Sequence, residues 1–214
     1  MKALILSGPN HGFAAAVPAL VEALSAGAGL QVAVTEDRNA YREPGACDVF
    51  VLGTGFTRGE RQADGSVARV SEFTPEQEVA LQDWVAGGGG LVGLHGTGWW
   101  IGGRAYDLIG GHANWHPPGL RFPVDISDSK HAITRGLASF EVDDEIYMCA
   151  HEPDLHILAS TEWQGRRHPL AWVRELGQGR VFYTTLGHSG ATFAQPGMAE
   201  LLRRATRWAG KGDE

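Results

Sequence analysis

The chain has 214 residues, of which 43% are hydrophobic, enough for one sizeable core and fitting one large domain better than two. Its formal net charge is −7, and no cluster of lysines and arginines stands out, which argues against a nucleic-acid-binding surface. We therefore expect the partner to be a neutral or polar small molecule.

The N-terminal run of residues 1–7 is apolar but too short for a signal peptide or a membrane span, and it predicts a first strand. Cys47 and Cys149 are too few for a disulfide framework, so we expect two buried thiols. A reducing compartment fits this pair, and the sequence predicts a cytoplasmic protein with no membrane contact.

Short apolar runs predict strands at residues 3–7, 30–35 and 48–52. A helix between the first two is predicted by apolar residues at helical spacing, namely Val17, Leu20, Val21 and Leu24. Pro18 suits its first turn, where the missing N–H costs nothing. Residues 53–73 predict a long polar loop.

Residues 74–77 predict a second helix start, with Thr74 as the cap, Pro75 in the first position and Gln77 reaching back. Glycines at 87–90 end this helix. Residues 91–94 are apolar on both faces, as expected of a parallel strand. The alternation of strands and helices predicts a doubly wound, mostly parallel sheet with helices on both faces.

The second half predicts extra β-strands instead of this alternation. Residues 120–126 alternate as in a half-exposed strand, and further short strands are expected at 145–149, 156–159, 170–174 and 180–184. A closing helix follows, with apolar residues from Met198 to Trp208. We predict one domain over residues 1–209 and a frayed tail at 210–214.

Three of the loops that follow predicted strands carry a histidine: His11, His95 and His188. Ligands of an open parallel sheet bind beyond the carboxyl ends of its strands. The sequence therefore predicts that these histidines meet at one site, with the turn after residue 94 at its centre.

Residues 93–97, Gly-Leu-His-Gly-Thr, have the layout of a nucleophile elbow, in which a strand runs into a tight turn flanked by glycine. The elbow residue is His95 rather than serine or cysteine. Histidine can serve as a general base, a proton shuttle or a metal ligand, but it is a poor acyl-enzyme nucleophile.

The chain resembles the ThuA-like family of trehalose utilisation over roughly residues 1–209. Order and spacing both match. The matching positions are residues 89–95, 110–111, 116–117, 131, 133–137, 144–147, 169, 172, 179–183 and 186–188.

This resemblance implies a three-layer α/β fold, flavodoxin-like and similar to class I glutamine amidotransferases. Those enzymes place a cysteine at the elbow, where this chain has His95, and His188 falls near the expected partner histidine. Glutamine hydrolysis through a thioester is thus excluded. The family implies carbohydrate metabolism, with trehalose or a keto-disaccharide as the substrate.

Glu145 and Tyr147 would share a face if Glu145 begins a strand. Alone, the acidic run at 143–145 would indicate a turn with a core tyrosine, but the resemblance makes Glu145 a site residue. His112 and His116 have the i, i+4 spacing of a metal-binding helix. Because two prolines follow at once, we expect a loop there, with His116 entering the site.

Aromatic and basic side chains surround the elbow. Trp99 is expected to stack on a sugar ring, although core packing is a serious alternative for it and for the neighbouring Trp100 and Trp115. Arg58 and Arg104 are expected to be exposed loop residues rather than substrate contacts. His168 is predicted to line a pocket rim.

Three hypotheses stay open. In the first, His95 and His188 are acid–base catalysts on a keto-sugar or glycoside, Glu145 orients one of them, and the substrate-binding residues are His11, His116, Tyr147 and Trp99. In the second, His95, Glu145 and His188 bind zinc or another divalent metal. In the third, the chain is a non-catalytic sugar-binding or partner-binding module. A homodimer is the default assembly.

Overall fold

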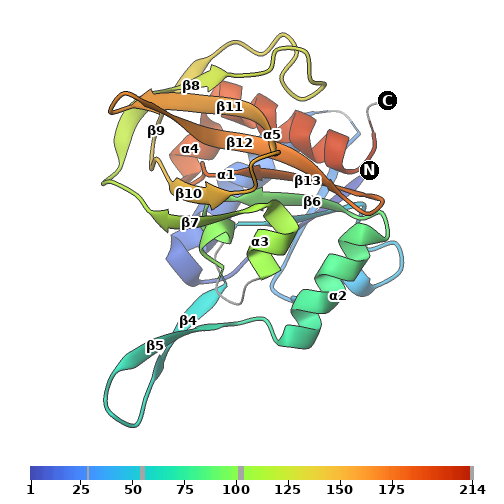
Figure 1. The fold of residues 1–214 in the computed structure, drawn as a ribbon. Helices are drawn as coiled ribbons and strands as arrows, with labels where there is room; N and C mark the ends of the chain where they lie inside the picture. Colours follow the sequence, from blue (N-terminus) through green and yellow to red (C-terminus); the bar gives the residue numbers. More distant parts are fainter. Residues whose placement is uncertain (28, 54–55, 101–103, 213–214) are drawn as a thin grey trace.

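The computed structural model describes residues 1–27, 29–53, 56–100 and 104–212, which form three layers around one large sheet (Figure 1). This sheet has nine strands in the order β2-β1-β3-β6-β13-β12-β11-β8-β9. The mixed α/β class predicted from the sequence is confirmed. Among the described residues, no helix is long and apolar enough to cross a bilayer.

The first five strands in this spatial order are parallel to one another, and their arrangement is that of flavodoxin-like folds. They are β2 (Gln31–Thr35), β1 (Lys2–Leu6), β3 (Val49–Leu52), β6 (Gly90–Leu94) and β13 (Gly179–Thr184). The remaining four pair antiparallel, and three of them match extra strands expected in the second half, whereas β9 was not predicted. They are β12 (Arg166–Leu176), β11 (His156–Trp163), β8 (Leu120–Ile126) and β9 (Phe140–Asp144).

Helices cover both faces of the parallel strands. One face packs against α1 (Phe13–Ser25), α4 (Gly190–Ala194) and α5 (Pro196–Ala209), and the other against α2 (Pro75–Ala86) and α3 (Arg104–Ile109). Alternating residues of β1 belong to the two cores, since Ile5 packs with α1 and α5 while Leu4 and Leu6 pack with α2 and α3. Short 3₁₀ turns lie at Asn10–Gly12, Ala40–Arg42 and His95–Trp99.

The two predicted helix starts had different outcomes. At α2 the capping box is present, because Thr74 Oγ1 accepts the N–H of Gln77 and Gln77 Oε1 accepts the N–H of Thr74. The placement of Pro18 in the first turn of α1 was wrong, because that helix begins at Phe13 and Pro18 lies inside it. Phe13 and Ala16 are buried, so the apolar face extends one turn earlier than the pattern indicated.

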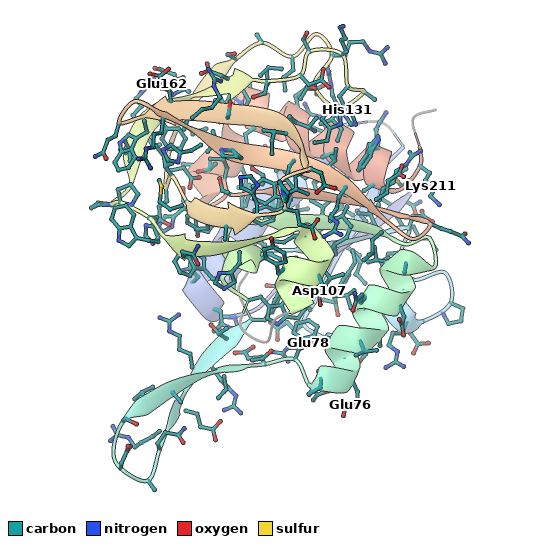
Figure 2. All side chains as sticks on the ribbon, viewed as in Figure 1. Glu76, Glu78, Asp107, His131, Glu162 and Lys211 are labelled. Carbon is teal, nitrogen blue, oxygen red and sulfur yellow. The ribbon has the colours of Figure 1, made fainter. Side chains whose placement is uncertain are left out.

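The predicted polar loop at 53–73 was also wrong, since it contains a β-hairpin of β4 (Thr57–Arg61) and β5 (Val67–Ser71). The hairpin projects from the body of the molecule (Figure 1). Polar residues occupy both of its faces, which hid the strand pattern. Its base is tied down by Glu78, which Figure 2 labels on α2. The Glu78 carboxylate accepts from Ser71 Oγ and from Trp100 Nε1, each at 3.1 Å.

Two further corrections concern strands near the site. Glu145 does not begin a strand, because β9 ends at Asp144 and β10 (Met148–His151) starts three residues after Glu145. His112 lies neither in a loop nor in a helix but in β7 (Gly111–Trp115), which pairs with β10 in a small separate sheet.

The two cysteines and the C-terminal residues were also subjects of predictions. Cys47 and Cys149 are free and half-buried rather than fully buried, and burial raises their pKa to about 11 and about 12, respectively. Residues 210–212 hydrogen-bond back to the last turn of α5.

Candidate metal centre

The three histidines that follow strands meet at the carboxyl end of the parallel sheet, as the sequence predicted. His11 follows β1, His95 follows β6 and His188 follows β13. His95 Nε2 lies 3.2 Å from His11 Nε2 and 3.3 Å from His188 Nδ1, and the last two atoms are 3.3 Å apart. One nitrogen of each ring therefore points into a common small space.

His95 has the backbone expected of an elbow. Its φ of +39° lies in the left-handed region, which is strained for a residue with a side chain. The hydroxyl of Tyr183 donates to the carbonyl oxygen of His95 at 2.9 Å. Gly187 leaves room for the Cβ of His95, because a Cβ added to Gly187 would lie only 3.3 Å from that atom. The neighbouring strand and loop thus hold this turn in place.

The ring of His95 is held in one tautomer. Its Nδ1 lies 2.8 Å from the carbonyl oxygen of Thr185, which can only accept, so Nδ1 carries the proton. Burial lowers the pKa of His95 to about 3, and the ring is neutral at pH 7. The lone pair of Nε2 therefore faces the other two histidines, as in metal-binding histidines whose second nitrogen donates to a carbonyl.

Glu145 adds a carboxylate to the cluster. Its Oε1 lies 3.3 Å from His188 Nδ1 and 3.5 Å from His116 Nδ1, and its Oε2 lies 3.6 Å from His95 Nε2. Within the described residues, Oε2 is buried and has no hydrogen-bond partner. A buried carboxylate oxygen without a donor is costly, and a cation among these groups would satisfy it.

Asp144 fixes the segments that carry this cluster. Its Oδ2 accepts the N–H groups of Gly187 and His188 at 2.9 and 3.3 Å and the hydroxyl of Thr192 at 2.7 Å. Its Oδ1 accepts the N–H of Glu145 at 2.7 Å. This buried side chain therefore links the loop after β13 to the end of β9, a role that the sequence, which indicated only an acidic run there, did not predict.

The spacing of the donors fits a zinc ion. Nitrogens of a tetrahedral site with Zn–N distances of 2.0–2.1 Å lie about 3.3–3.4 Å apart, close to the separations observed here. One donor atom from each of His11, His95, Glu145 and His188 lies within 4.8 Å of all the others. His11 was expected to bind substrate, but its position makes it a fourth candidate ligand.

Comparison with protein families identifies the chain. The ThuA family model, described as trehalose utilisation, matches residues 2–209. The chain belongs to the ThuA family. No curated protein matches this ThuA-family chain at a significant level.

Solved structures agree on the fold of this ThuA protein. A ThuA-like protein from Parabacteroides merdae superposes with a TM-score of 0.76 at 19% identity, covering 99% of this chain and 90% of that one. A ThuA-like protein from Bacteroides uniformis superposes with a TM-score of 0.74 at 21% identity, covering 98% of this chain and 91% of that one. A β-galactosidase from Bacillus circulans superposes with a TM-score of 0.65 at 14% identity, and the match covers 98% of this chain but only 31% of the β-galactosidase.

The other predicted site residues of the ThuA protein also gather here. The hydroxyl of Tyr147 lies 2.8 Å from His95 Nε2, and burial followed by the charge of Glu145 raises the pKa of this phenol, so it stays protonated and can donate to this nitrogen or, where a cation takes the lone pair, to another oxygen. The Trp99 ring meets the rings of Tyr147 and His116 edge-on, with centroids 5.6 and 5.9 Å apart.

A cavity of about 650 Å³ lies beside the cluster. Its walls include His11, Trp99 and His116, and also Arg58, which lies in β4 rather than in a loop. His168 does not line it and packs near Trp163 instead. The side chain of Arg104 falls outside the described part of the chain.

Proposed function

We propose that this ThuA-family chain is a zinc-dependent enzyme of carbohydrate metabolism that acts on a keto-sugar or its glycoside. The observation that carries the proposal is the convergence of three imidazole nitrogens and one buried, unpartnered carboxylate oxygen. His11, His95, His188 and Glu145 would hold the ion. A zinc ion there would supply Lewis-acid polarisation of a substrate oxygen.

The state of His95 favours this role over acid–base catalysis. An efficient general base has a pKa near the working pH, whereas burial lowers the pKa of His95 to about 3. A neutral ring with a fixed lone pair is what a metal ligand requires. His95 therefore fits the metal-ligand role of the second hypothesis better than the catalytic role of the first.

Groups around the ligands suit a sugar. The protonated hydroxyl of Tyr147 can donate a hydrogen bond to a substrate oxygen, and Trp99 offers an apolar face beside the cavity. The cavity volume of about 650 Å³ lies within the range of small-molecule sites. A cytoplasmic location and a homodimer remain predictions.

Elemental analysis of the protein purified without added metal tests the proposal. We expect about one zinc per chain, lost in His95→Ala and His188→Ala and retained in the control His168→Ala, whose ring lies outside the cluster. Turnover of a keto-sugar panel should disappear with a chelator and return with zinc. A zinc content near zero that zinc incubation does not raise would overturn the metal assignment.

The same measurements separate the remaining hypotheses. Turnover that persists in metal-free protein and is lost in His188→Ala would favour acid–base catalysis without metal. Sugar binding with no product, with or without zinc, would favour the non-catalytic module.

A further inference from the structure

The β4–β5 hairpin forms one wall of the cavity beside the metal centre. It contributes Thr57, Arg58 and Gly59 from β4 and Val67 and Arg69 from β5. The opposite wall comes from the loops after β1 and β6, with His11 and Trp99. The hairpin therefore belongs to the binding site, although it projects from the body of the molecule (Figure 1).

The charge of this cavity is opposite to that of the whole protein. The chain carries a net charge of −7, yet the residues that line the cavity include two arginines and two histidines and no aspartate or glutamate among the described residues. Such local concentration of one sign attracts ligands of the other. A neutral sugar would need neither arginine.

The two arginines differ in whether their donors are available. Arg69 makes no ion pair with a carboxylate of the described residues, and it lines the cavity together with His11. It stands opposite Gly59 in the hairpin register, so no side chain from the paired residue covers it. Arg58 pairs with Glu60 at 3.4 Å, and both side chains are about half exposed.

We propose that this cavity binds the oxyanion group of an acidic sugar derivative, a phosphate or a carboxylate, through Arg69, which shares its face of the hairpin with the lining residues Thr57, Gly59 and Val67. Arginine matches the planar, two-oxygen face of either group with paired N–H donors. The sugar ring would lie between the hairpin and the histidines, beside Trp99. This inference rests on the proposed function only for the reacting end of the substrate, which faces the metal.

Three ligands that differ only at one carbon test the proposal. We would measure the affinity of the full-length chain for glucose, glucuronate and glucose 6-phosphate, as purified and after chelation. Both acidic ligands, or one of them, should bind at least about tenfold more tightly than glucose, and which one identifies the anion. Because the preference must persist after chelation, direct capture of the anion by a bound metal cannot produce it.

Matched variants locate the anion site. Arg69→Gln should lower the affinity for the preferred acidic ligand about tenfold and leave that for glucose and the zinc content unchanged. Arg61→Gln, on the same hairpin but outside the cavity lining, is the control and should change nothing.

Failure of this proposal is distinct from failure of the proposed function. Equal affinity for the three ligands, absence of binding at about 1 mM, or an equal loss in Arg61→Gln overturns the anion site even if zinc is present. Conversely, an acidic preference that depends on Arg69 in a protein that never binds zinc keeps the anion site and removes the metal centre.

Discussion

Asp144 and Glu145 are adjacent in the sequence, but their carboxylates have opposite surroundings. Both oxygens of Asp144 accept hydrogen bonds, from three N–H groups and one hydroxyl. Glu145 Oε2 is buried and accepts none from the described residues. Asp144 thus stabilises the loop that carries His188, whereas Glu145 is left free for a ligand.

The pair predicts opposite effects of removing each charge. Asp144→Asn turns an acceptor into a donor facing N–H groups, so we expect a loss of about 3 kcal/mol, seen as a Tm lower by about 6–12 °C. Glu145→Gln should keep the Tm of metal-free protein within a few degrees, because no hydrogen bond of Oε2 is lost. Its zinc affinity should fall by more than about 100-fold. Equal Tm values for the two metal-free variants would contradict these assignments.

Stability should fall with acid because His95 is buried in its neutral form. Its pKa is about 3 in the folded chain and near 6.5 when unfolded, so the unfolded state binds a proton first as the pH drops. The contribution is complete above pH 6.5 and is lost progressively down to about pH 3. Between pH 7 and pH 5 the free energy of unfolding should fall by about 2 kcal/mol from this residue alone.

Denaturant unfolding of metal-free protein at both pH values measures this loss. In His95→Asn, whose side chain tolerates the left-handed backbone, the difference between the two pH values should shrink by most of that amount. An unchanged difference would mean that other groups cause the acid sensitivity.

The sequence predicted the centre of the site better than its edges. Carboxyl ends of parallel strands share one edge of a sheet, so His11, His95 and His188 could be brought together from loop positions alone. Whether His11 touches metal or substrate depends on ångström-scale distances, which no pattern encodes. The role of Asp144 was missed because it arises from hydrogen bonds between the end of β9 and the loop after β13, which are distant in the sequence.

The hairpin shows where hydrophobic patterning gives no information. Residues 57–71 are mostly exposed on both faces, so they lack the alternation that marks a half-buried strand. Their structure comes from the turn at Asp64 and Gly65 and from attachment of the base at Ser71 to Glu78. Arg58 was consequently expected to be an uninvolved loop residue.

Tyr147 gives a prediction that separates chemistry from metal binding. Tyr147→Phe removes the hydroxyl that lies 2.8 Å from His95 Nε2 but none of the four candidate ligands. We expect zinc content to be unchanged and kcat on the active keto-sugar to fall about 100-fold, since one positioned hydrogen-bond donor to a developing negative charge contributes about that much. Parallel measurement of zinc and kcat checks it. Loss of zinc in this variant would instead make the phenol part of the metal site.

A substitution at Gly187 tests how closely the elbow at His95 and the loop that carries His188 are packed. Its φ is +129°, and a Cβ there would lie 2.9 Å from the ring of Phe193 and 3.3 Å from His95 Cβ. Gly187→Ala should therefore cost about 2–3 kcal/mol and weaken zinc binding through displaced histidines. Gly8→Ala is the matched control, because Gly8 lies in the loop before His11 and a Cβ added there would have no described atom within 4 Å. Thermal melts and zinc titration of the two variants compare them, and similar values would show that the loop tolerates the added methyl group.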